Sequence, residues 1–162
     1  MLTRVGMTLC AAVVLLAACG GSQPAPDVTF TSLNGKEIPL QTLRGEVVLV
    51  NFWATSCDVC VKEMPDLAQL QRRFGERGMT LVAVAMHYDP PNHVLDYAKS
   101  AELPFVVSLD PLGKIEQAFG GISGTPTTFV IDRRGRIASR IQGAPDFARL
   151  HTLIEAKLAE PA

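Results

Sequence analysis

Two unbroken apolar runs, one on each side of a segment with helical spacing, constrain the fold of this chain more than any other feature. Residues 47–53 and 81–86 are almost entirely apolar and lack polar alternation, a pattern typical of strands buried on both faces. Between them, from Cys57 to about Phe74, apolar side chains recur every three or four residues, which predicts a helix. This order predicts a right-handed parallel βαβ unit, with residues 47–53 as the central strand.

The remaining sequence predicts one mixed α/β domain around this unit. Further strands are expected at residues 28–31, 38–40, 104–108, 127–132 and 136–142, and further helices at residues 92–101, 112–119 and 145–158. The dipeptide Asn34-Gly35 favours a tight turn, so the first two strands should form a hairpin that extends an edge of the main sheet. The 162 residues are 48% hydrophobic and 19% charged, which fits a single globular domain with a short appendage. Because 15 Lys and Arg residues are balanced by 16 Asp and Glu residues, we expect no nucleic-acid partner.

The N-terminus has the features of a secretory signal peptide. Arg4 is the only charged residue before Asp27, and it precedes an apolar run over residues 5–18 that only Gly6 and Thr8 interrupt. This run is shorter than the roughly 20 residues that a membrane-spanning helix needs, which favours cleavage over an uncleaved membrane anchor. We therefore predict that residues 1–18 are removed.

A cysteine directly after this segment predicts a lipid anchor. Residues 16–19, Leu-Ala-Ala-Cys, resemble a bacterial lipobox, in which a diacylglyceryl group alkylates the cysteine thiol and the cysteine becomes the mature N-terminus. The alternative is an ordinary signal peptide with an incidental cysteine. Lipidated Cys19 and a tether would occupy residues 19–27, and the domain residues 28–160. This predicts a protein held on a bacterial membrane outside the cytoplasm, on the periplasmic side if the host has two membranes, where disulfides persist.

Two cysteines stand where the central strand passes into the helix that follows it. In Cys57-Asp58-Val59-Cys60 the first cysteine lies at the helix N-terminus, where free backbone N–H groups and the helix dipole stabilise a thiolate. The second cysteine lies one helical turn further on, within disulfide reach of the first. The spacing therefore indicates thiol-disulfide exchange, with Cys57 as the nucleophile and Cys60 as the thiol that resolves the mixed disulfide.

Three other interpretations of this pair are open. A zinc site typically has four ligands, but the mature chain has no third cysteine beyond the lipobox, and His87, His93 and His151 are not at zinc spacing. A purely structural disulfide across so short a loop would add little stability, because that stabilisation grows with loop length. Two buried inert thiols would be unusual at the start of a helix. We favour thiol-disulfide exchange because it accounts for the position of both cysteines, one at the helix N-terminus and one a helical turn further on.

The cysteine motif and a second motif together resemble those of the thioredoxin fold. Residues 52–60 are similar to the active-site segment of the membrane-anchored TlpA/ResA-like thiol-disulfide oxidoreductases, and residues 124–132 resemble their cis-proline loop and following strand. Residues 92–108 match the segment inserted in this group relative to thioredoxin. The resemblance covers residues 28–158 and implies an α/β thioredoxin fold with an N-terminal β-hairpin extension and a central helix-strand insertion. It also implies a redox-active disulfide, with no metal and no other cofactor.

The resemblance assigns roles to individual residues. It makes Cys57 the attacking thiol, Cys60 the resolving thiol and Pro126 the cis-proline that faces the disulfide. A cis bond is low in energy only before proline, and the backbone of Thr125 would then be presented to an incoming extended peptide. An ordinary trans proline before a strand is the alternative. Trp53, Thr125 and Pro126 are the expected substrate-binding residues.

Glu63 is the expected acid of the site. It stands three residues after Cys60 and matches a family acidic residue near the buried sulfur, where it would move the proton of the resolving thiol. The alternative is a solvated helix glutamate. The chain has Asn51 where thioredoxin itself has a buried acid, which makes Glu63 more important. Ser56 and the pair Asp58-Val59 depart from the family pattern, so the substrate surface is expected to be altered.

The predicted function is reduction of protein disulfides by the dithiol, with electrons from an upstream membrane thiol donor. Because the carboxylate of Asp58 repels a thiolate at Cys57, we expect the reducing direction. Cytochrome c maturation is one role that the family resemblance implies.

Two alternative functions belong to other classes. A thiol peroxidase would require threonine in place of Ala54. A copper carrier would use Cys57 and Cys60 with His87 or Met86, because sulfur and imidazole suit copper.

Overall fold

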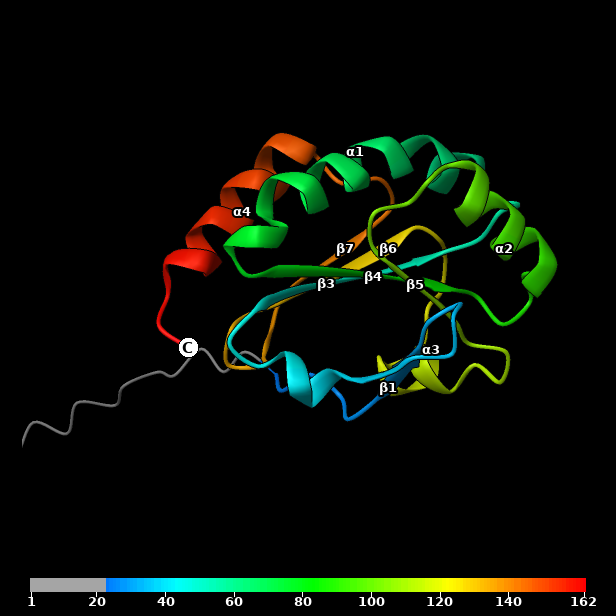
Figure 1. Cartoon of the computed structure of the whole chain (residues 1–162). Coiled ribbons are helices and arrows are strands. Elements are labelled where there is room, and N and C mark those ends of the chain that lie inside the picture. The colour runs from blue at the N-terminus through cyan, green and yellow to red at the C-terminus, as the bar shows by residue number, and fades with distance from the viewer. Residues whose placement is uncertain (1–22) are drawn as a thin grey trace, which may run out of the picture.

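A computed structural model describes residues 23–162 of the chain (Figure 1). Its strands are β1 (Thr29–Thr31), β2 (Glu37–Pro39), β3 (Val47–Trp53), β4 (Met79–Ala85), β5 (Val106–Leu109), β6 (Thr127–Ile131) and β7 (Ile137–Gln142). Its helices are α1 (Asp58–Phe74), α2 (Pro91–Ser100), α3 (Lys114–Ala118) and α4 (Phe147–Ala159), with 3-10 helices η1 (Leu40–Leu43) and η2 (Gly75–Arg77). The predicted signal peptide and the lipidation of Cys19 fall outside the described residues. Within residues 23–162 no helix combines the length and the apolar character needed to cross a membrane.

Five strands form one mixed sheet in the order β5-β4-β3-β6-β7, with β3 in the centre as predicted. Strand β3 pairs in parallel with β4, and β4 pairs in parallel with β5, whereas β6 runs antiparallel to both β3 and β7. Near the end of β3, Phe52 pairs with Val84 on one side and Thr127 on the other. The loops after β3 and β4 and the loop before β6 therefore meet at one edge of the sheet.

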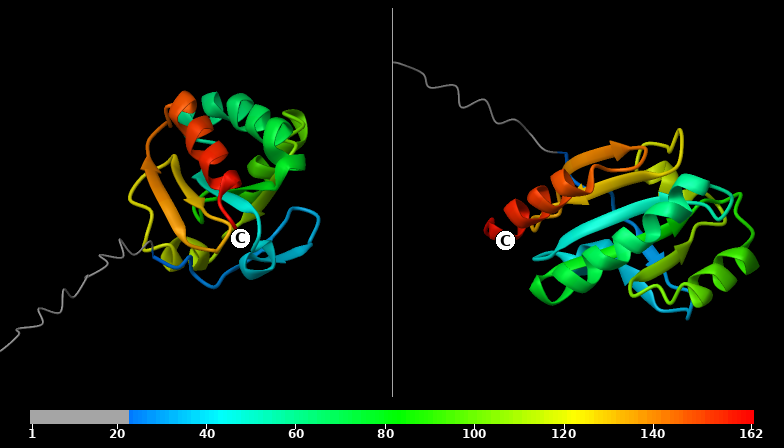
Figure 2. Two further views of the ribbon diagram at one scale, coloured as in Figure 1. Left: turned by 90° about the vertical axis from the view of Figure 1, so that its left-hand side faces the viewer. Right: turned by 90° about the horizontal axis from the view of Figure 1, so that it is seen from above.

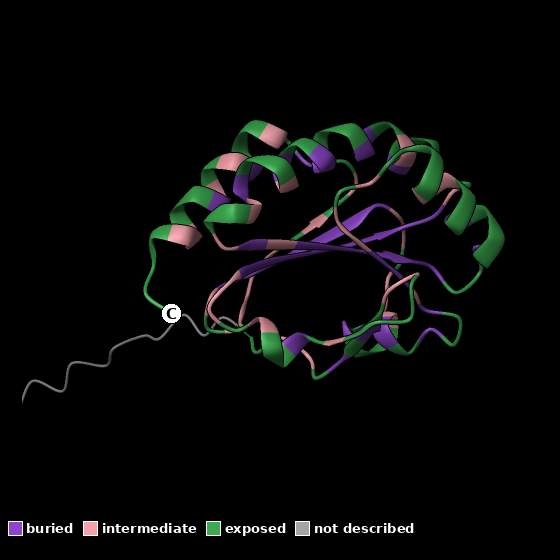
Figure 3. Ribbon diagram, in the orientation of Figure 1, coloured by how far each residue is buried: buried purple, intermediate pink, exposed green. Residues whose placement is uncertain are grey.

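The two faces of the sheet are covered by different elements, as Figures 1 and 2 show. Helices α1, α2 and α4 pack on one face, and the β1–β2 hairpin, η1 and α3 pack on the other. Along β3, Leu49 and Trp53 point into the first layer, whereas Val50 and Phe52 point into the second. All seven residues of β3 are buried (Figure 3), which explains why the sequence shows no polar alternation there.

The predicted N-terminal hairpin is present, but its strands are not part of the main sheet, and an isolated antiparallel bridge between Ser32 and Ser108 joins it to the edge strand β5. Strands β1 and β2 form a separate two-stranded sheet. Phe30 in β1 is fully buried beneath the main sheet, next to α3. The hairpin contacts the β5 edge through a hydrogen bond from Leu33 N to Val107 O at 3.1 Å. Because burying the Phe30 ring stabilises packing against the face of the sheet, the hairpin leaves the plane of the sheet.

Part of the predicted tether is attached to the domain. Ala25 N donates a hydrogen bond to Gly135 O at 2.9 Å, and Ile137 N donates one to Gln23 O at 2.8 Å. Contacts with the domain therefore begin before residue 28. The sequence did not reveal this because backbone hydrogen bonds of this kind need no particular side chains.

Candidate active site

The turn between β3 and α1 holds Cys57 and Cys60 in a disulfide, with their Cα atoms 5.2 Å apart. Cys57 N donates a hydrogen bond to Ala54 O at 3.1 Å, which closes the turn directly after the strand. Cys57 is the N-cap residue of α1, and its Sγ accepts a hydrogen bond from Cys60 N at 3.2 Å. The sulfur of Cys57 thus lies where the first free amides of the helix stabilise negative charge.

The two cysteines differ in exposure. Cys57 is half-buried, whereas Cys60 is 0% exposed and packs in the core beside Met64 and Trp53. A large thiol or disulfide from solvent can therefore contact the sulfur of Cys57 and not that of Cys60.

The cis-proline loop lies at the same edge of the sheet as the cysteines. The peptide bond between Thr125 and Pro126 is cis, as the sequence predicted. Because Thr127 pairs with Phe52, Pro126 immediately precedes β6 beside the end of β3. Pro126 is buried and Thr125 is half-buried. The structure therefore brings Thr125 and Pro126 to the end of the strand from which the Cys57 turn departs.

Glu63 lies on the buried face of α1 and is 3% exposed, so the solvated alternative is wrong. Asn51 Nδ2 in β3 donates hydrogen bonds to Glu63 Oε1 at 2.9 Å and to Thr128 Oγ1 in β6 at 3.0 Å. The pKa of Glu63 is raised from 4.5 to about 7: burial raises it most, the hydrogen bond from Asn51 lowers it, and the charge of Asp66 raises it. A carboxyl group with a pKa of about 7 both accepts and releases protons at neutral pH.

The structure corrects the prediction that the Trp53 side chain binds substrate. Trp53 is 0% exposed, and its ring packs against Tyr97 of α2 with the centroids 5.4 Å apart. The inserted helix α2 covers the indole, so no surface of this side chain is available to a client.

Asp89 is a further residue of this edge, which the sequence did not predict. Thr55, two residues before Cys57, donates from its backbone N to Asp89 Oδ2 at 2.6 Å and from Oγ1 to Asp89 Oδ1 at 2.5 Å. Asp89 is 5% exposed and lies in the loop after β4. The only signal in the sequence is an acidic residue before Pro90 and Pro91, which indicates a loop but no partner.

The residues of the copper alternative do not lie together. Met86 packs in the core on the opposite face of the sheet from Cys60. His87 is exposed, and its Nδ1 lies 3.0 Å from Glu116 Oε2. In the described part of the chain, no three His, Cys, Asp or Glu side chains form a group that could hold a metal ion.

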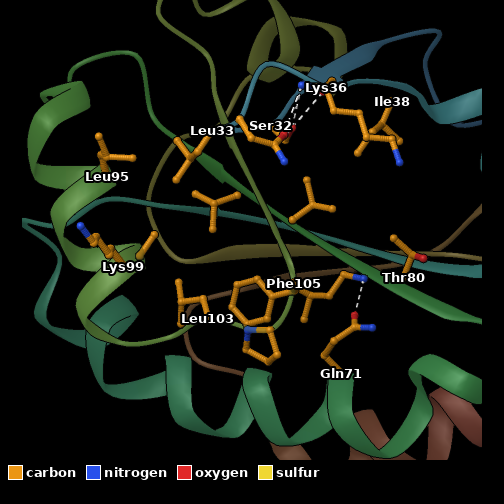
Figure 4. A pocket seen from close by; sticks show the side chains of 16 residues that line it. Ser32, Leu33, Lys36, Ile38, Gln71, Thr80, Leu95, Lys99, Leu103 and Phe105 are labelled. Atoms are coloured by element: carbon orange, nitrogen blue, oxygen red, sulfur yellow. Dashed lines mark hydrogen bonds between the residues drawn. The ribbon is translucent and has the colours of Figure 1, made fainter.

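A cavity of about 570 Å³ lies away from the cysteines, between the β1–β2 hairpin, α2 and α1 (Figure 4). Leu33, Leu103 and Phe105 are among its lining residues, and Gln71 Oε1 accepts a hydrogen bond from Leu81 N at 2.9 Å at its wall. Neither cysteine lines it, nor does Pro126. The thiol chemistry is therefore located at the surface edge of the sheet and not in this cavity.

A thioredoxin fold, a Cys-x-x-Cys disulfide at the start of the helix after the central strand and a cis-proline beside it define the class of thiol-disulfide oxidoreductases.

Comparison with known proteins specifies the class further. The redoxin family matches residues 21–154. The thiol-disulfide oxidoreductase ResA of Bacillus thuringiensis subsp. konkukian is 35% identical over 119 residues, which cover 74% of this chain and 68% of that protein. ResA of Bacillus subtilis is 33% identical over 127 residues, which cover 78% of this chain and 70% of that protein. The crystal structure of a thiol:disulfide interchange protein from Chlorobium tepidum TLS superimposes with a TM-score of 0.80 at 31% identity, over 88% of this chain and 100% of that one. The chain belongs to the redoxin family, within its ResA-type thiol-disulfide oxidoreductases.

Proposed function

We propose that this thiol-disulfide oxidoreductase is anchored on the outer side of a membrane and reduces disulfides of protein clients. The observation that carries the proposed exchange with clients is the unequal exposure of the two cysteines. A half-buried Cys57 at a helix N-terminus suits attack on an external disulfide, and a buried Cys60 suits a second, intramolecular attack.

The proposed reaction has two exchange steps. The Cys57 thiolate attacks one sulfur of the client disulfide, a bond forms between Cys57 and the client, and the other client sulfur leaves as a thiolate. The Cys60 thiolate then attacks Cys57 Sγ, the Cys57–Cys60 disulfide forms, and the remaining client sulfur leaves as a thiolate. Two electrons pass from the dithiol to the client, whose two thiolates take up protons.

Glu63 supplies the proton acceptor for the second step. The Cys60 thiol lies in the core, so it cannot release its proton directly to solvent. Glu63 follows one turn later on the same buried helix face, and its pKa of about 7 leaves a substantial carboxylate fraction at neutral pH. In the proposed step the carboxylate takes the Cys60 proton as the thiolate forms.

The client is expected to bind along the cis-proline loop. Within residues 23–162, the backbone of Thr125 makes no hydrogen bond, so its polar groups are available to an extended peptide. This leaves Thr125 and Pro126 as the proposed client-binding residues, without Trp53.

The reducing direction and the anchor rest on other residues. Asp58 is the first residue of α1 and is exposed, so its carboxylate opposes a thiolate at Cys57 only moderately. The lipobox-like residues 16–19 support attachment through Cys19. An upstream membrane thiol donor would return the disulfide to the dithiol by the reverse pair of exchanges.

Trapping of clients tests this function. In cells that express the full chain with Cys60→Ser, Cys57 should accumulate in mixed disulfides with other proteins, visible as species of higher mass that dithiothreitol removes. The matched control is Cys57→Ser, in which only the buried cysteine of the pair remains. Equal trapping by both variants, or none by Cys60→Ser, would contradict the proposal.

A further inference from the structure

Asn51 is the one residue with a polar amide in the central strand, and it is fully buried. Both hydrogens of its side-chain amide are used, one on Glu63 Oε1 and one on Thr128 Oγ1. A buried amide in the middle of an apolar strand is costly unless it is hydrogen-bonded, so a leucine would pack here with less penalty. The position is therefore occupied by a residue whose hydrogen bonds serve something other than the core.

The hydrogen bonds of Asn51 fix which oxygen of Glu63 is free. Oε1 is occupied by the amide, whereas Oε2 is buried and has no partner among the described residues. If the side-chain amide of Asn51 were rotated by half a turn, Asn51 Oδ1 would face Glu63 Oε1, and the two oxygens would repel each other while Glu63 is ionised. Thr128 Oγ1 holds the second amide hydrogen, and the strand pairing of β3 with β6 sets Thr128 directly opposite Asn51.

We propose that Asn51, held by Thr128, is a positioning residue that keeps Glu63 Oε1 occupied and leaves Glu63 Oε2 as the atom that takes the proton of Cys60. This inference rests on the proposed role of Glu63. The proton moves from Cys60 Sγ to Oε2, the Cys60 thiolate attacks Cys57 Sγ, and the client sulfur leaves with the electron pair of the broken bond.

Burial raises the pKa of Glu63 most, and the same hydrogen bond lowers the pH at which the step operates. An N–H donor stabilises the carboxylate form, so loss of the Asn51 bond would raise the pKa of Glu63 further above 7. Of the groups that face Glu63, Asp66 on the same helix carries charge, whereas β3 and β6 present Asn51 and Thr128, which do not titrate. The midpoint of the resolving step should therefore respond to Asn51 and Thr128 although neither residue accepts the proton.

The experiment separates the two exchange steps with Ellman's reagent, 5,5′-dithiobis(2-nitrobenzoate), as the disulfide. Attack by Cys57 on the reduced full chain releases the first thionitrobenzoate, and resolution by Cys60 releases the second, so a stopped-flow trace gives both rates. We expect the second rate of the native protein to rise with pH through a midpoint near 7. In Asn51→Leu and Thr128→Val that midpoint should move up by about one pH unit, which lowers the second rate at pH 7 about fivefold. The first rate should be unchanged.

Thr128→Ser and Glu63→Gln complete the test. Thr128→Ser keeps the hydroxyl and should keep the native midpoint. Thr128→Val, introduced above, is nearly isosteric with threonine, so it tests the inference even if Asn51→Leu fails to fold. A native midpoint in folded Thr128→Val would overturn the inference, provided that Glu63→Gln slows the second rate. If Glu63→Gln leaves the second rate unchanged, the proposed role of Glu63 itself is wrong, and the inference falls with it.

Discussion

The carboxylate of Asp89 accepts two hydrogen bonds from Thr55, one from the backbone N at 2.6 Å and one from Oγ1 at 2.5 Å. Thr55 belongs to the turn that presents Cys57, and Asp89 belongs to the loop that follows the neighbouring strand β4. The two parallel strands are thus joined at the edge where the cysteines lie. A carboxylate with two acceptors fits the two donors of Thr55, whereas an amide does not.

We expect Asp89→Asn to destabilise the protein and to disturb the active-site turn. Replacing one carboxylate oxygen by an NH2 group opposes a donor to a donor in a buried place, which should lower the free energy of unfolding by about 1 to 3 kcal/mol. Urea unfolding of the oxidised protein measures this change. Thr55→Ser keeps both donors and should behave as the native protein, while Thr55→Val should show a smaller loss. Native stability of Asp89→Asn would show that the contact contributes nothing.

The order of the two thiols predicts different behaviour for their alanine variants. Cys57→Ala should abolish thiol-disulfide exchange, because the remaining Cys60 sulfur is buried. Cys60→Ala should still form mixed disulfides but should not release them. Alkylation of the reduced native protein with iodoacetamide, followed by peptide mass spectrometry, should modify Cys57 faster than Cys60. Equal modification rates would contradict the assigned order.

Glu63→Gln is expected to stabilise the oxidised protein at alkaline pH. The pKa of Glu63 is about 7 in the folded protein, whereas in the unfolded chain the carboxyl has its ordinary value of 4.5. Between these two pH values the folded protein therefore binds more protons than the unfolded chain. Stability of the native protein should therefore fall as the pH rises from about 4.5 to 7. Glutamine does not ionise, so the variant should be more stable at pH 8 by about 3 kcal/mol and nearly equal at pH 4.5.

The control for this prediction is an exposed glutamate without a described partner. Glu76 lies at the surface in η2, and Glu76→Gln should show no comparable pH dependence. Urea unfolding between pH 4.5 and 8 compares the three proteins. A constant difference between Glu63→Gln and the native protein across this range would show that Glu63 does not titrate near 7.

The sequence predicted those parts of the molecule that local pattern determines. Strand β3 is buried on both faces and α1 on one, so their apolar spacing was sufficient to predict both. The cysteine pair was predictable for the same reason, since a helix N-cap and its first turn are local. The roles of Asp89 and Thr128 could not be predicted, because strand pairing brings them to their partners from far along the chain. Asp89 is 34 positions from Thr55, and Thr128 is 77 positions from Asn51.

The error over Trp53 has a similar cause. A tryptophan at the end of a strand beside the cysteines is a reasonable client-binding residue if nothing covers it. Helix α2 places Tyr97 against the ring, and only the packing of that inserted helix decides the exposure of the indole.

The proposed anchor predicts a specific N-terminus for the mature protein. Intact-mass and peptide mass spectrometry of the membrane-extracted protein should find Cys19 as the first residue with a diacylglyceryl adduct. In Cys19→Ala the protein should leave the membrane fraction, or remain unprocessed. A native protein recovered in soluble form with unmodified Cys19 would contradict the lipid anchor.

The reduction potential of the Cys57–Cys60 couple tests the central proposal, a disulfide reductase, most directly. Equilibration of the purified protein with defined mixtures of oxidised and reduced dithiothreitol or glutathione, followed by alkylation and mass analysis, gives the potential. The helix N-terminus favours the Cys57 thiolate and Asp58 opposes it, so we expect a potential nearer the roughly −270 mV of thioredoxin than the roughly −120 mV of a strong oxidant. A value above about −180 mV would contradict the reductase assignment and indicate an oxidant or an isomerase.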